Sequence, residues 1–274
     1  MARNSAKRSL GFWLQLGLTL AVSGFLGVPI LQSMLAGVTR NIFTGVLKSG
    51  LTLDWVGQVL TLYWPAILLS IEIAIGCLAV TLLIGVPAAY GLARAPGRLA
   101  RLAEEALVLP IAVPGLALAL AMVIAYNGWG GFRQTAWFIL AGHVLFTLPF
   151  MIRAVLAVMA SSDLATLEEG AASLGAGFFR RFFDVVLPNC RSGILAGALT
   201  VVTLSIGEFN LTWLLHTPLT KTLPVGLADA YASLRLEIGS AYTLVFFVLI
   251  VPLLVALQML GRPRRMKALP EDTV

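Results

Sequence analysis

The chain has 274 residues, of which 59% are hydrophobic and only 12% are charged. A water-soluble domain of this length would have too few polar side chains to cover its surface, so the composition excludes a soluble protein and indicates an integral membrane protein. The formal net charge is +6, but the bases stand in short clusters beside apolar runs and not along an aromatic, nucleic-acid-binding surface. We therefore expect these basic residues to interact with membrane lipid and not with nucleic acid.

The first apolar run, residues 10 to 35, follows the basic residues Arg3, Lys7 and Arg8. A signal peptide has an apolar region of only about 7 to 15 residues. This run is long enough to cross a hydrocarbon core of about 30 Å, and no convincing small-residue cleavage site follows it. We expect a retained first transmembrane helix.

Five further segments are long and apolar enough to span a bilayer. The sequence thus predicts an all-α, polytopic protein with six transmembrane helices, at residues 10 to 35, 64 to 93, 104 to 126, 136 to 158, 192 to 215 and 238 to 261. Pro110, Pro114 and Gly115 should bend the third helix, because neighbouring helices in a membrane can satisfy the carbonyl groups that a proline leaves free. Gly193 and Gly197 form a GxxxG pair, which is either a packing face or a chance spacing.

The distribution of Lys and Arg predicts the orientation. Fourteen of the nineteen lie in the N-terminal tail, the 94 to 103 loop, the long loop with its flanks, and the C-terminal tail, so both termini are expected in the cytoplasm. Tryptophan rings prefer the membrane interface, and five lie near the opposite helix ends: Trp55, Trp64, Trp129, Trp137 and Trp213.

These elements divide the chain into three parts. Residues 1–63 hold a cytoplasmic tail, the first helix and an outer loop. Residues 64–261 form a core of five helices with a long cytoplasmic loop at 159–191, and residues 262–274 form a second tail. A disulfide between Cys77 and Cys190 would have to join a span interior to its edge, so we expect both cysteines to be reduced.

The long cytoplasmic loop is a polar, basic and aromatic island in this apolar chain. Thr166-Leu167-Glu168-Glu169 fits a capping box, in which a threonine hydroxyl and a glutamate carboxylate satisfy each other's backbone donors, so a helix should begin at Leu167. Gly175 can take a positive φ and end it. A second short helix should run from Ala176 to about Val186, where Leu187-Pro188 stops it.

The second of these helices should have an aromatic face, formed by Phe178, Phe179, Phe182 and Phe183, with two arginines on another face. Such a helix could lie on lipid headgroups or fill a groove in a soluble partner. The capping box, the break at Gly175 and the Leu-Pro stop favour the groove.

This loop resembles the EAA motif of permease subunits of binding-protein-dependent ABC importers, with Gly170 in place of the first alanine of the motif. That change of one small residue for another slightly weakens the helix. The resemblance implies that the loop forms coupling helices in a cleft of an ATPase. The residues expected to couple to the ATPase are Glu169, Gly170, Ala171, Gly175, Phe178, Phe179, Phe182, Val185, Leu187 and Pro188.

The resemblance extends over about residues 65 to 260. IGVPAAYGLAR at 84 to 94, LPIAVPG at 109 to 115 and GHVLFTLPF at 142 to 150 look like the second, third and fourth helices of this superfamily. It implies the type I importer permease fold, a location in the bacterial inner membrane, and a role as half of a translocation pathway.

The partners follow from the same resemblance. The chain has no GxxxxGK[ST] sequence, so ATP and Mg should bind two separate ATPase subunits. A second permease subunit is implied, identical or homologous, with a homologous partner favoured, together with an extracytoplasmic solute-binding protein. Two histidines and two cysteines lie scattered without metal-ligand or catalytic spacing. We therefore expect no enzyme, cofactor or metal site on this chain.

Ionisable residues within the spans are candidates for the substrate pathway, because their burial is costly. These are Glu72, His143 and Glu208, each of which could instead make a structural polar contact. By resemblance, Glu208, Asn210 and Thr212 face the pathway, and GEFNLTW is most similar to polyamine permeases. The cargo is expected to be a polyamine or a similar cationic or zwitterionic solute, with 2-aminoethylphosphonate or ferric iron as alternatives.

Two other classes of protein fit less well. An ion-coupled secondary transporter would often show inverted repeats, and none is visible. A membrane scaffold would not explain a capped, aromatic cytoplasmic loop.

Overall fold

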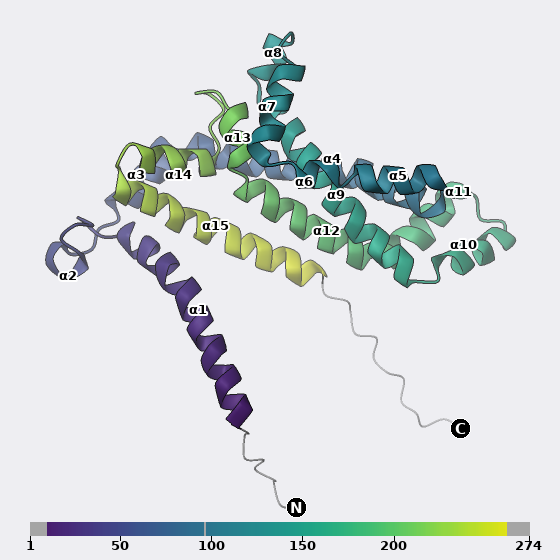
Figure 1. The fold of residues 1–274 in the computed structure, drawn as a ribbon, viewed down its shortest axis with the longest axis horizontal. Coiled ribbons are helices and arrows are strands. Elements are labelled where there is room, and N and C mark those ends of the chain that lie inside the picture. The colour runs from purple at the N-terminus through teal and green to yellow at the C-terminus, as the bar shows by residue number, and fades with distance from the viewer. Residues whose placement is uncertain (1–9, 96, 262–274) are drawn as a thin grey trace, which may run out of the picture. The chain divides into compact units, whose positions relative to one another are not determined.

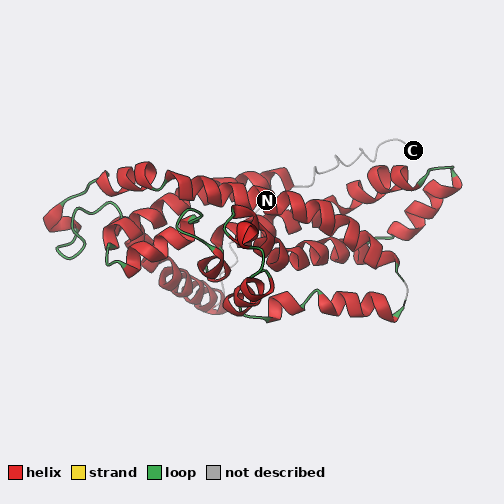
Figure 2. Cartoon of the chain, turned by 90° about the horizontal axis from the view of Figure 1, so that it is seen from above, coloured by secondary structure: helices red, strands yellow, loops and turns green. Residues whose placement is uncertain are grey.

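The computed structural model describes residues 10–95 and 97–261 (Figure 1). Figure 2 shows these residues as helices and loops, and their one β-type pairing is an isolated bridge between Thr39 and Leu51. The all-α prediction is therefore confirmed. The basic N-terminal residues Arg3, Lys7 and Arg8 and the tail at 262–274 lie outside the described residues. The described chain forms two compact units.

The first unit comprises the chain up to Tyr63 and the segment Leu227–Val248. It holds α1 (Leu10–Ala36), α2 (Val46–Ser49), α3 (Asp54–Leu62), the end of α14 (Leu223–Ala232) and the beginning of α15 (Leu236–Gly261). The chain after α1 approaches the α15 backbone at Gly37, where a Cβ atom would lie 2.6 Å from the backbone nitrogen of Ala241. Only glycine permits this approach.

The second unit comprises Trp64–Gly226 and the segment that begins at Leu249. Its core consists of three long helices. These are α4 (Trp64–Arg94), α9 (Ala136–Ser161) and α12 (Leu187–Gly207), which pack against one another (Figure 1). A Cβ atom on Gly193 of α12 would lie 2.6 Å from the carbonyl oxygen of Ala154, and one on Gly197 would lie 2.7 Å from Met151 Sδ. The GxxxG pair is therefore a real packing face against α9.

The third predicted span is broken. Its residues form α5 (Arg98–Ala106), α6 (Leu109–Ala112) and α7 (Gly115–Ala125), and the segment Arg98–Ala112 meets α7 at 104°. Val113 and Pro114 between them are extended (ψ 130° and 137°), so the expected bend is a full break. Beyond α7 lies α8 (Gly130–Arg133), and Figure 1 shows α7 and α8 projecting from the three long helices.

The fifth span differs at both ends from the range predicted from the sequence. It begins earlier, because α12 starts at Leu187, and it breaks after Gly207, beyond which α13 occupies Asn210–Leu215. Glu208 is extended at the break, with ψ 117°. Counting helices only among the described residues, five stretches are long and apolar enough to cross a membrane, or six if the bent third segment is one span. This agrees with the predicted number of spans.

Candidate functional site

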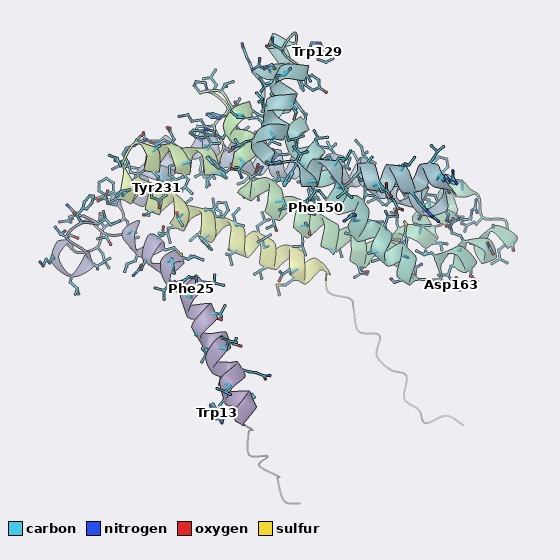
Figure 3. The ribbon with its side chains drawn as sticks, in the orientation of Figure 1. Trp13, Phe25, Trp129, Phe150, Asp163 and Tyr231 are labelled. Carbon is cyan, nitrogen blue, oxygen red and sulfur yellow. The ribbon has the colours of Figure 1, made fainter. Side chains whose placement is uncertain are left out.

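The loop that follows α9 begins with α10 (Leu164–Ser173), three residues before the predicted start. Thr166 Oγ1 donates to Asp163 Oδ1 at 2.8 Å from within the first turn, so the proposed capping box is wrong. Leu164 is buried in the core of the second unit, and this burial favours a helix that already includes it. Figure 3 labels Asp163 at one end of the unit and Trp129 at the end of the α7–α8 projection.

The predicted end of this helix is confirmed. Gly175 has a φ of +83°, which a residue without a Cβ atom adopts at little cost. Its backbone N–H donates to Ala172 at 2.9 Å, and the N–H of Ala176 donates to the carbonyl of Ala171 at 3.0 Å. This pair of bonds is a Schellman motif, which satisfies the last carbonyl groups of α10.

The second arm of the loop is not a separate short helix. α11 (Phe178–Arg181) continues into a π-helical turn (Phe182–Val186) and then directly into α12. The predicted stop at Leu187-Pro188 is wrong, because the helix continues through Pro188 into α12. The wider π turn before it absorbs the change in hydrogen bonding, and Asn189 Nδ2 donates to the carbonyl of Val185 at 2.7 Å.

Much of the aromatic face on this second arm is exposed. The exposed fractions are 53% for Phe178, 72% for Phe179 and 57% for Phe183. Phe182 is partly buried, with its ring 5.3 Å from that of Tyr90. Of the other residues expected to couple, the exposed ones are Glu169, Gly170, Gly175 and Pro188, and the partly buried ones are Ala171, Val185 and Leu187.

The most deeply buried charge of the loop was not predicted from the sequence. Glu168 is 1% exposed and forms an ion pair with Arg94 at the end of α4. The hydroxyl of Tyr90 donates to Glu168 Oε1 at 2.8 Å. The available signal was spacing: Glu168 follows the apolar Leu164 by four residues and so shares its buried face, whereas the neighbouring Glu169 is exposed.

The candidates for the substrate pathway fall into different environments. His143 is 1% exposed, and its ring lies 2.8 Å from Ser205 Oγ at Nδ1 and 2.8 Å from Thr212 Oγ1 at Nε2. Thr212 is likewise fully buried. These contacts join α9 to α12 and α13, and they account for a histidine inside a span without a bound substrate. The role of His143 and Thr212 in transport stays a prediction.

Glu208 and Asn210 lie at the break between α12 and α13. Glu208 Oε1 accepts the N–H of Leu211 at 2.6 Å, so this carboxylate satisfies a backbone donor at the start of α13. A Cβ atom built on Gly115 would lie 3.3 Å from Asn210 Cβ and 3.4 Å from Glu208 Oε1. The break in the third span therefore meets the break in the fifth.

Glu72 is not in contact with this meeting point. It is exposed on α4 and lines a separate pocket of about 150 Å³ together with Trp137 and Leu140 of α9.

Residues 81–266 match the protein family described as "binding-protein-dependent transport system inner membrane component". The chain is 26% identical to the putative 2-aminoethylphosphonate transport system permease protein PhnV of Salmonella typhimurium over 240 residues, 87% of this chain and 90% of that protein. It is 30% identical to the sulfate transport system permease protein CysW of Synechocystis over 214 residues, 72% of this chain and 76% of that one.

A similar fold occurs in the crystal structure of a bacterial ABC transporter involved in the import of the acidic polysaccharide alginate. The TM-score is 0.71 at 16% identity, over 94% of this chain and 96% of that chain. Permease subunits of this kind are non-catalytic, which supports the expectation that this chain is no enzyme. The chain is thus a member of the family of binding-protein-dependent transport system inner membrane components, a multi-pass inner-membrane permease subunit of an ABC importer that works with an ATPase and a solute-binding protein.

Proposed function

We propose that the loop at 159–191 couples this permease to its ATPase, with Phe178, Phe179 and Phe182 in the contact. The observation that carries the proposal is the continuity of the helical chain from Phe178 to Gly207. A soluble partner that moves the exposed aromatic face would move α12 with it as a rigid body. The aromatic face lies at the cytoplasmic end of this continuous helix, and the helix break at Glu208 lies at its other end.

The remaining residues of the coupling loop have supporting roles. Gly175 sets the angle between the two arms through its positive φ. Gly170 and Ala171 have no large side chains, so a partner can approach the backbone of α10. Glu169 offers an exposed carboxylate on α10. Val185, Leu187 and Pro188 form the junction with α12.

The assembly we propose contains two ATPase subunits, which hold ATP and Mg, and a second permease subunit homologous to this one. Two permeases together enclose a pathway that one helical subunit cannot enclose. ATP-driven closure of the two ATPases would then bring the two coupling loops together, and the helices would transmit this motion as rigid elements.

The coupling proposal is tested by Phe179→Glu in proteoliposomes that contain the complete transporter and its binding protein. A charge on the contact face should abolish ATP-dependent uptake while the permease still inserts. Phe43→Glu is a matched control, because Phe43 is 83% exposed and lies in the predicted outer loop. Normal uptake by the Phe179 variant would refute docking through this face.

For the cargo, we propose a zwitterionic oxyanion, with 2-aminoethylphosphonate as the first candidate. The alignment with PhnV, which is named for 2-aminoethylphosphonate, covers most of both chains. CysW is named for sulfate, which is also an oxyanion. At the meeting of the two helix breaks, α7 begins at Gly115 beside the exposed Asn210. The free N–H groups of a first helical turn attract anions, and the Glu208 carboxylate would suit an ammonium group.

This cargo proposal predicts a specific effect of Glu208→Gln, which retains an acceptor for the N–H of Leu211. The variant should lose the preference of the importer for 2-aminoethylphosphonate over ethylphosphonate, which lacks the amine. Uptake of both compounds in unchanged ratio would remove Glu208 from the pathway.

A polyamine is the second candidate. It is favoured by the pocket beside Glu72, which combines a carboxylate with the indole of Trp137, since aromatic rings attract organic cations. Uptake of a polyamine that falls in Glu72→Gln, with a binding protein that retains polyamines, would support this candidate. A binding protein that retains only phosphonates would exclude it.

A further inference from the structure

The last turn of α4 makes three polar and aromatic contacts that the coupling motif does not include. Arg94, the last residue of α4, forms an ion pair with Glu168 of α10. Tyr90, one turn earlier, donates its hydroxyl to the other oxygen of the same carboxylate at 2.8 Å. The Arg94 guanidinium also lies 5.2 Å from the centre of the Tyr90 ring. Both oxygens of Glu168 are therefore engaged by one helix end.

Tyr90 contacts the second arm of the loop as well. Its ring is 6.1 Å from that of Phe178 and 5.3 Å from that of Phe182, both in edge-to-face geometry. The end of α4 thus holds α10 by charge and hydrogen bonding, and it holds α11 and the π turn by aromatic packing. Both arms of the coupling loop therefore contact Tyr90, and Arg94 adds an ion pair with the first arm.

A buried carboxylate is an unexpected choice at this place if packing were its only purpose. Removal of a charge from water is costly unless a partner compensates for it, and an apolar residue such as Leu164 fills the same face one turn earlier. Arg94 is 39% exposed, whereas Glu168 is 1% exposed, so the carboxylate carries most of this cost. The hydrogen bond from Tyr90 to the same carboxylate fixes the orientation in which Glu168 meets Arg94.

From these contacts we propose that Tyr90, Arg94 and Glu168 form a clamp that positions the coupling loop on α4. The inference rests on the proposed coupling function and adds a second route for motion. Displacement of the aromatic face would move α4 through the clamp together with α12 through the continuous helix. Glu168 is a positioning residue in this scheme, and the exposed Glu169 is the carboxylate that remains free to meet a partner.

The clamp is tested with Glu168→Gln, Arg94→Gln and the double variant in the reconstituted transporter. The measured quantity is the number of cargo molecules imported per ATP hydrolysed. Each single variant should lower this ratio by about tenfold, within the range of couplings between distant sites, while ATP hydrolysis continues. The double variant should be no worse than either single variant, because both charges act through one contact.

Two controls separate the clamp from a general effect on folding. Glu105→Gln removes an exposed carboxylate on α5 and should leave the ratio unchanged. Arg94→Lys keeps the charge and should restore most of the coupling lost in Arg94→Gln. An unchanged ratio in both Glu168→Gln and Arg94→Gln would overturn the proposal, as would losses in the double variant equal to the product of the single losses.

A second measurement does not depend on transport. Amide hydrogen exchange over residues 164–173 should be faster in Glu168→Gln than in the wild type, because the clamp holds α10 in place. Exchange equal to that of the wild type would overturn the clamp even if the chain transports normally. Failure of the wild-type transporter to couple ATP hydrolysis to uptake would instead refute the proposed function, and it would leave the exchange result to decide the clamp.

Discussion

The packing of α12 on α9 can be tested by adding a single methyl group. In Gly193→Ala, the new Cβ atom would lie 2.6 Å from the carbonyl oxygen of Ala154 and 2.8 Å from Val158 Cγ2. Real Cβ atoms essentially never approach within 3.0 Å of such an atom. The nearest atom belongs to the backbone, so it cannot rotate away, and the two helices must separate.

Two opposing contributions decide how much Gly193→Ala changes the free energy of unfolding. Overpacking of a core costs about 1 to 3 kcal/mol, and the backbone contact places Gly193→Ala near the upper end. Alanine is favoured over glycine inside a helix by about 1 kcal/mol. The free energy of unfolding should therefore fall by about 2 kcal/mol. In Gly197→Ala the nearest atom is Met151 Sδ, at the end of a flexible side chain, so the two terms should nearly cancel.

Gly91→Ala is the matched control, because Gly91 lies in α4 with nothing within 4 Å of the added atom. It should stabilise the protein by up to about 1 kcal/mol. Unfolding can be followed with a thiol-reactive dye, since both cysteines, Cys77 and Cys190, are free and buried. Equal stability of the Gly193 and Gly91 variants would refute the close approach of the two helices.

Three further predictions concern single contacts. His143→Ala leaves the buried hydroxyls of Ser205 and Thr212 without their shared partner and should lower the free energy of unfolding by about 2 kcal/mol; the dye assay would contradict this if the unfolding midpoint did not move. Gly175→Ala places a side chain at a φ of +83° and should cost about 1 kcal/mol, measured against Gly177→Ala, where φ is −69°; equal stability of the two would argue against the turn. Glu208→Ala removes the acceptor for the N–H of Leu211, so hydrogen exchange at that amide should be faster than in Glu208→Gln, and equal rates would mean that the carboxylate does not cap α13.

Features governed by local rules could be predicted from the sequence. Apolar length was enough to find the spans, because a bilayer fixes how long a hydrophobic helix must be. The break at Gly175 followed from the conformational freedom of glycine. The bend of the third span followed from Pro114 and Gly115, although its angle did not.

Other features depend on contacts that local rules do not contain. Leu187-Pro188 was predicted to end a helix, but a π turn before Pro188 lets the helix continue. Thr166 has a good capping sequence, yet burial of Leu164 moves the start of α10 to that residue. The partners of Glu168 lie on α4, and one of them, Arg94, is 74 residues away in the sequence. Adjacent glutamates look alike in a sequence, and only the packed structure separates the buried one from the exposed one.

Docking of the aromatic face of the coupling loop on the ATPase can be tested by cross-linking. A photoreactive phenylalanine analogue would replace Phe179 in one preparation and Phe43 in another, since both positions are well exposed. We expect a covalent adduct with the ATPase subunit from position 179 and none from position 43. Adducts from position 179 with lipid alone, or with the ATPase from position 43 alone, would contradict this docking.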